Sequence, residues 1–227
     1  MASLLLAAAT FLALHVVVSG TRLRDAIVGT IGDGPYRGLF ALASLAIIVW
    51  MARAYAGAAE LPLWQAPRSL QWLAVLLGLP AALLVAVGLT TPNPTTTGAE
   101  SLLAEGVPVR GIVRVTRHPF LAGVAIWAFA HLLVNGDTAS IVLFGTLLSL
   151  ALLGPRLIDA KRARAYGERW AVFAAQTSVL PFAAIAAGRN RFVVHEIGTW
   201  RLLLGAVVYV ALLAGHRWLI GVPALPQ

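Results

Sequence analysis

The sequence contains no cysteine among its 227 residues. A chain without cysteine forms no disulfide, holds no metal through thiolate and carries no thiol nucleophile. Any metal that it binds must therefore be held by histidine, carboxylate or backbone oxygen. Charged residues are also scarce, because they make up 11% of the chain whereas soluble globular proteins average about 25%.

Long apolar runs accompany this scarcity of charge. Hydrophobic residues make up 59% of the chain, and the mean hydropathy is +0.84. A helix needs about 17 to 25 residues to cross a bilayer, and six apolar segments approach or reach that length. They comprise residues 3–18, 38–55, 70–90, 119–134, 140–157 and 200–220. The sequence therefore predicts an all-α polytopic membrane helix bundle of about six transmembrane helices, forming one domain over residues 1–227 in the lipid bilayer.

The basic residues follow the expected topology. The net charge of +8 would indicate nucleic acid in a soluble protein, but here no nucleic-acid partner is expected. Alternate segments between the apolar runs hold 14 and 3 of the 17 lysines and arginines. The positive-inside rule then places the basic segments in the cytoplasm and both termini on the outer face of a bacterial inner membrane.

The most charged stretch comprises residues 159–178. Its charged residues precede Trp170 and Phe173, which is typical of a helix that leaves the membrane and lies at the cytoplasmic interface. The first interpretation is a solvated face that binds lipid phosphates. The alternative is that Arg162, Arg164 or Arg169 reaches a carboxylate of a bound cofactor.

Histidines are the main candidates for chemistry. Pro119 suits the first turn of a helix, so Arg117 and His118 are expected at its water-filled mouth, with His131 about three and a half turns deeper. Trp127 precedes His131 by four residues and Asn135 follows it by four, so the three share a face. That face is either a packing seam or the wall of a ligand pocket, because an ionisable residue inside a membrane helix indicates function by default.

Two further histidines lie in other apolar segments. His15 in the first segment either hydrogen-bonds a neighbouring helix or binds a ligand. His216 stands beside Arg217 and Trp218, which favours an interfacial anchor first and a ligand second. The tight turn at 135–137 predicts that residues 119–157 form a helical hairpin.

Five sequence blocks together resemble the NnrU family. They are FLALH at 11–15, GDGPYRGLF at 32–40, TRHP at 116–119, IWAFAHLLVNGD at 126–137 and TSVLPFAAI at 177–185. The second half also looks like the related zeta-carotene isomerase of plants and cyanobacteria. The resemblance implies a membrane protein that binds heme b through two histidines, which fall by motif on His15 and His131. A cysteine of the isomerase corresponds to Ala128, so ligand exchange through that sulfur is not expected.

The resemblance leads to a functional hypothesis. We expect a heme-b membrane protein that isomerises cis and trans double bonds of a hydrophobic polyene, such as a carotenoid, with the iron redox state permitting transient electron donation. His15 and His131 would bind the iron, Arg114 a heme propionate, and Trp127 and Asn135 would line the pocket. His118 and Arg117 are the candidates for catalysis, where His118 orients substrate or hydrogen-bonds a propionate.

Two other functions stay open. One is a heme protein of electron transfer or nitric-oxide metabolism, which the family associates with denitrification. The other is a membrane methyltransferase of the isoprenylcysteine carboxyl type, whose motif resembles the block around His118. That pattern places a tyrosine at Leu121 and requires a later glutamate pair, which this sequence lacks.

The predicted depths of the two iron ligands conflict with their pairing. His15 lies about five residues from the cytoplasmic end of its helix and His131 about fourteen from Arg117, which is a difference of roughly 12 Å at 1.5 Å per residue. Judged by depth alone, His131 with His216, or His15 with His118, would pair more easily. The motif correspondence nevertheless favours His15 with His131.

Overall fold

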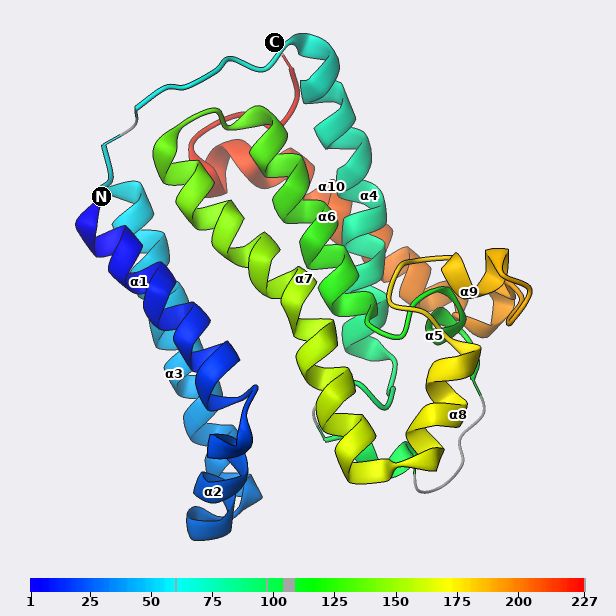
Figure 1. Ribbon diagram of the computed structural model, residues 1–227. Helices are drawn as coiled ribbons and strands as arrows, with labels where there is room; N and C mark the ends of the chain where they lie inside the picture. Colours follow the sequence, from blue (N-terminus) through cyan, green and yellow to red (C-terminus); the bar gives the residue numbers. More distant parts are fainter. Residues whose placement is uncertain (60, 97, 104–108, 227) are drawn as a thin grey trace.

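The computed structural model is a bundle of helices and describes residues 1–59, 61–96, 98–103 and 109–226 (Figure 1). The long elements are α1 (Ala2–Ala13) with the π-helix η1 (Leu14–Val18), α3 (Asp33–Ala56), α4 (Arg68–Thr90), α6 (Pro119–Val134), α7 (Thr138–Tyr166) and α10 (Thr199–Ile220). The short helices are α2 (Arg22–Ile31), η2 (Glu100–Leu103), α5 (Ile112–Val115), α8 (Glu168–Gln176), α9 (Ala183–Ala186) and η3 (Val194–Glu196). All six predicted apolar segments are helical, so the all-α membrane bundle is confirmed.

The lengths of these helices decide how many of them can cross a membrane. By length and composition α3, α4, α7 and α10 can each span it. The pair formed by α1–η1 and α2 would count as a fifth span, bent by 78° at its break. Helix α6 has 16 residues and is about 24 Å long, which is shorter than a hydrocarbon core of about 30 Å. The described residues therefore contain four helices that can span a membrane, or five with the bent pair, where about six were predicted.

Helix α6 lies between α4 and α7, and α10 packs on the far side of α4. Gly123 permits the close approach of α6 to α4, because a Cβ there would lie 2.8 Å from the Ala81 carbonyl oxygen. Helices α1 and α3 pack on each other, and α1 also contacts α7. Figure 1 shows both termini at one end of the bundle and helices α2, α5 and α8 towards the other.

The predicted hairpin of residues 119–157 is confirmed. Asp137 caps α7 because its carboxylate accepts hydrogen bonds from the backbone N–H and the hydroxyl of Ser140, at 2.8 and 2.6 Å. The Gly136 carbonyl accepts the backbone N–H of Leu63 at 2.7 Å. The segment before α4 is thereby fixed across the turn.

The charged stretch of residues 159–178 forms two helices rather than one. Helix α7 continues to Tyr166, and Gly167 with φ of +52° redirects the chain into α8. The charged side chains of Glu168 and Arg169 are exposed, as the interfacial interpretation requires. Trp170 and Phe173 instead pack into a buried apolar cluster with residues of α4 and α5. Helix α8 is therefore held on the end of the bundle by protein contacts.

Candidate functional site

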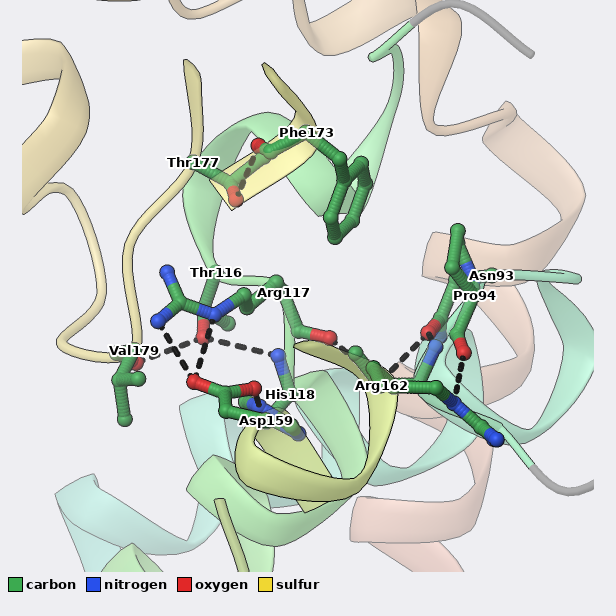
Figure 2. A network of polar contacts seen from close by, with 11 residues as sticks. Asn93, Pro94, Thr116, Arg117, His118, Asp159, Arg162, Phe173, Thr177 and Val179 are labelled. Atoms are coloured by element: carbon green, nitrogen blue, oxygen red, sulfur yellow. Dashed lines mark hydrogen bonds and ion pairs between the residues drawn. The ribbon is translucent and has the colours of Figure 1, made fainter. Parts of the chain in front are cut away.

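A buried polar network surrounds the first turn of α6 (Figure 2). His118 is the N-cap residue and Pro119 occupies the first helical position, where its missing N–H costs nothing. The backbone N–H of Arg117 donates to the Ser178 carbonyl at 2.9 Å, and that of Phe182 donates to the Val115 carbonyl at 2.8 Å. The fold thus places the TRHP block directly beside the TSVLPFAAI block.

Asp159 of α7 is the centre of this network (Figure 2). Its Oδ2 accepts hydrogen bonds from Nε and Nη2 of Arg117, at 3.0 and 2.6 Å. Its Oδ1 accepts from Nε2 of His118 at 2.7 Å. One carboxylate therefore fixes two adjacent side chains and ties α7 to the start of α6.

The surrounding loops satisfy the backbone groups of the same segment. The Thr116 hydroxyl donates to the Val179 carbonyl at 2.7 Å, and the Thr95 hydroxyl lies 2.6 Å from the Arg117 carbonyl oxygen. Arg162 donates through Nε to the Pro94 carbonyl at 2.9 Å. The loop after α4 is therefore folded onto the network.

The network excludes water from His118, of which only 3% is exposed. The expectation of a water-filled mouth is wrong for this residue, because the loop after α4 and the segment after α8 close over it. Burial lowers the pKa of His118, and its hydrogen bond to Asp159 opposes that shift only in part. His118 is therefore neutral at neutral pH.

Arg114 forms a second ion pair nearby. Its Nε donates to Oε2 of Glu196 at 2.7 Å and its Nη2 to Oε1 at 3.0 Å, while Nη1 donates to Asn190 at 2.7 Å. The hydrogen bonds that Glu196 accepts from Arg114, and then that from the backbone N–H of Gly111, lower the pKa of Glu196 to about 2. Both Arg114 and Arg117 are thus engaged by carboxylates of the protein, so a cofactor acid group would have to compete for them.

The predicted shared face around His131 is confirmed. Nδ1 of His131 donates to the Trp127 carbonyl at 2.8 Å, and the two rings lie 4.6 Å apart. Nδ2 of Asn135 donates to the His131 carbonyl at 2.9 Å. The His131 ring also stacks on Phe144 at 4.7 Å. Because Nδ1 carries the proton, the Nε2 lone pair of His131 is left for another partner.

His15 lies in a different environment, at the π-helical end of the first long helix. Its Nδ1 donates to the Phe11 carbonyl at 2.9 Å, and its ring packs against Phe40 at 5.1 Å. A cavity of about 380 Å³ adjoins it. The lining residues include His15, Ser19, Tyr36, Phe40 and Lys161. The Nε2 lone pair of His15 is thus available beside an aromatic and basic cavity.

The structure does not bring His15 and His131 into contact. His131 stacks on Phe144, whereas a Cβ on Gly20, five residues after His15, would lie 3.1 Å from Leu157. Phe144 beside His131 and Leu157 beside Gly20 are separated by about 20 Å along α7. The chain from Gly20 back to His15 shortens this separation by at most about 8 Å. The depth difference of roughly 12 Å therefore persists. Among the described residues no cluster of three or more histidines and acids could hold a metal.

Three polar residues in these sites were missed by sequence reasoning. Asp159 joins both members of the Arg–His pair, Asn93 holds Thr95 through two hydrogen bonds, and Tyr36 lines the cavity beside His15. Asp159 could have been found, since the chain has only nine acidic residues and this one follows a long apolar run. Asn93 and Tyr36 carry no comparable signal.

Curated proteins give two partial matches. This chain is 41% identical over 81 residues to the chloroplastic 15-cis-zeta-carotene isomerase of Zea mays, a match that covers 36% of this chain and 22% of the relative. It is 40% identical over 80 residues to the protein of the same name from Arabidopsis thaliana, covering 35% and 22%. No solved structure matches. A family model described as NnrU protein matches residues 3–224, which is nearly the whole chain, so this protein belongs to the NnrU family.

Proposed function

We propose that this protein binds heme b and isomerises double bonds of a hydrophobic polyene of the carotenoid class. The names of the two partial relatives support the reaction. The observation that carries the heme proposal is the histidine beside the cavity, because Nδ1 of His15 is held by the Phe11 carbonyl at 2.9 Å. Iron-binding histidines characteristically donate their second ring N–H to such an acceptor, which fixes the ring and leaves Nε2 for the metal.

The residues around His15 fit a heme in composition. The cavity of about 380 Å³ combines the aromatic ring of Phe40 with Arg24, Arg37 and Lys161. A heme needs an apolar surround for its macrocycle and cations for its two propionates. A bound heme supplies one-electron redox chemistry, which would lower the barrier to rotation about a conjugated double bond.

We propose His131 as the second iron ligand, as the motif correspondence implies. Its ring is oriented by the Trp127 carbonyl at 2.8 Å in the same way as that of His15, and Asn135 secures its backbone at 2.9 Å. His216 is the competing ligand, because its expected depth in the membrane matches that of His131 more closely than the depth of His15 does. The depth difference between His15 and His131 makes this competition a point for experiment.

We propose that Arg117 and His118 serve the reaction by positioning. Neither side chain lines the two cavities of the basic end, and both are fixed on Asp159. By fixing the position of α6 along α7, the Asp159 contacts would also fix the position of His131 along the helix axis. Arg114 would act similarly through Glu196, and it is a weaker propionate partner than the cavity cations.

We further propose that the end of the bundle bearing α2 and α8 faces the cytoplasm of a bacterial inner membrane. The excess of basic residues in alternate segments supports this orientation through the positive-inside rule. Both termini would then lie on the outer face.

Alanine substitution of single histidines, followed by absorption spectra of detergent-purified protein, tests the heme proposal. We expect His15→Ala and His131→Ala each to lose or convert the low-spin heme spectrum, whereas His216→Ala and His195→Ala retain it. His118→Ala should keep the heme and lose isomerisation of a cis polyene. Loss of the spectrum in His216→Ala but not in His131→Ala would refute the ligand pair. Absence of any heme bands in the wild type after supplying heme would refute the function.

A further inference from the structure

A basic cleft lies between α2, α3 and the C-terminal end of α7, which is the end that we propose faces the cytoplasm. The cavity beside His15 adjoins a neighbouring cavity of about 620 Å³, because Arg24, Arg37 and Lys161 line both. Six basic and two acidic side chains line the combined cleft. The lining therefore carries an excess of four positive charges. Such an excess in a partly enclosed space favours an anionic ligand.

The cleft also contains buried polar atoms that none of the described residues satisfies. Tyr36 is only 7% exposed, and its hydroxyl has no hydrogen-bond partner among the described residues. The Ser44 hydroxyl, one more lining group, is in the same condition. A buried hydroxyl without a partner costs about 1 to 3 kcal/mol, so these groups point to a ligand with acceptor atoms.

The basic side chains are held in place by the protein. Nη2 of Arg24 donates to Oδ1 of Asp33 at 2.7 Å, and Arg37 pairs with the other oxygen of that carboxylate. The Arg24 guanidinium also lies 5.4 Å from the centre of the Tyr36 ring. Asp33 thus orients two cations of the cleft, and one of them packs on the Tyr36 ring. Preorganised cations of this kind bind planar acid groups well.

We propose that this cleft binds the two carboxylates of the porphyrin whose iron His15 ligates. Arg37 and Lys161 neutralise the carboxylates, and the Tyr36 hydroxyl donates to one of them. The bond between His15 and the iron rests on the proposed function, whereas the contacts with the carboxylates are argued from the cleft alone. This proposal places the acid-binding role in the cleft, where six basic side chains outnumber two carboxylates, rather than at Arg114 and Arg117, each of which pairs with a carboxylate of its own.

Heme b and its dimethyl ester provide a direct test, because the ester retains the iron and lacks both negative charges. Full-length apo-protein in detergent is titrated with each compound, and the affinities are read from the Soret band. We expect Arg37→Gln, Lys161→Gln and Tyr36→Phe each to weaken heme binding about tenfold or less, as expected for one charge-assisted hydrogen bond. The same variants should bind the ester as the wild type does. Arg53→Gln, an exposed arginine outside the cleft, is the matched control and should change neither.

A metal-free porphyrin separates this inference from the iron proposal. Protoporphyrin IX has the carboxylates but no iron, so its binding should depend on Arg37 and Lys161 and be indifferent to His15→Ala. Suppose that heme binding requires His15, but the ratio of heme affinity to ester affinity is the same in the cleft variants as in the wild type. The carboxylate assignment is then wrong and the proposed function stands. If protoporphyrin IX binding depends on the cleft but no heme spectrum depends on His15, the iron ligand is wrong instead. Arg37→Lys should restore most of the affinity, which excludes misfolding as the cause.

Discussion

Replacement of Asp159 by asparagine probes the network that joins α6 and α7. The carboxylate accepts two hydrogen bonds from Arg117 and one from His118, and the three side chains are 18%, 14% and 2% exposed. The asparagine oxygen can accept either the two bonds from Arg117 or the one from His118, whereas its NH₂ group can accept neither. The Arg117 charge is left without an opposite charge where water reaches it poorly.

The expected cost follows from these contacts. Removing one partner of a buried ion pair costs about 3 to 5 kcal/mol, and the partial exposure of Arg117 favours the lower end. We therefore expect Asp159→Asn to lower the free energy of unfolding by about 3 kcal/mol. Asp25→Asn is the matched control. Its pair with Arg24 spans 3.4 Å at a carboxylate that is 57% exposed, so we expect a loss below about 1 kcal/mol.

Reversible unfolding by SDS in mixed micelles, followed by tryptophan fluorescence, measures both variants. Trp170 is a local reporter, because its ring centre lies 5.9 Å from the Arg117 guanidinium. A double-mutant cycle with Arg117→Gln should give a coupling energy of about 2 kcal/mol between the two sites. A loss below 1 kcal/mol for Asp159→Asn, or additive single effects, would show that the pair contributes little to stability.

Three further predictions concern pH, packing and topology. Burial holds the pKa of His118 below its unfolded value of 6.5, so the unfolded state binds the extra proton and stability falls as pH drops below 6.5, by up to about 1.4 kcal/mol per pH unit for this group. His118→Gln should remove that part of the pH dependence of SDS unfolding between pH 6.5 and 5.5. An unchanged pH dependence would contradict this prediction. Gly123→Ala should destabilise the protein by about 1 to 3 kcal/mol, because its Cβ would lie 2.8 Å from the Ala81 carbonyl oxygen. Gly145→Ala is the control and should be neutral or stabilising in the same assay, because nothing lies within 4 Å of its Cβ. Single cysteines at Ala2 or Leu225 should react with an impermeant maleimide from outside the cell, and one at Arg164 only after permeabilisation; the reverse pattern would invert the proposed orientation.

The sequence by itself determined the class of the fold and the position of its helices. Apolar length and the scarcity of charge require helices in a bilayer, because each backbone polar group must be satisfied within its own segment there. The hairpin turn before Thr138 and the shared face of Trp127, His131 and Asn135 were also local, since they depend on chain spacing alone. These features were all predictable, and the structure has them.

Only the tertiary structure decided which distant residues meet. Asp159 lies 41 residues from His118 along the chain, and the spacing of helical residues gives no sign that the two pair at 2.7 Å. The burial of His118 likewise depends on the loop after α4 and the segment after α8 closing over it, which no local pattern encodes. His15 acquires its basic cavity in the same way, because Tyr36 and Lys161 come from helices whose relative placement depends on side-chain packing between them.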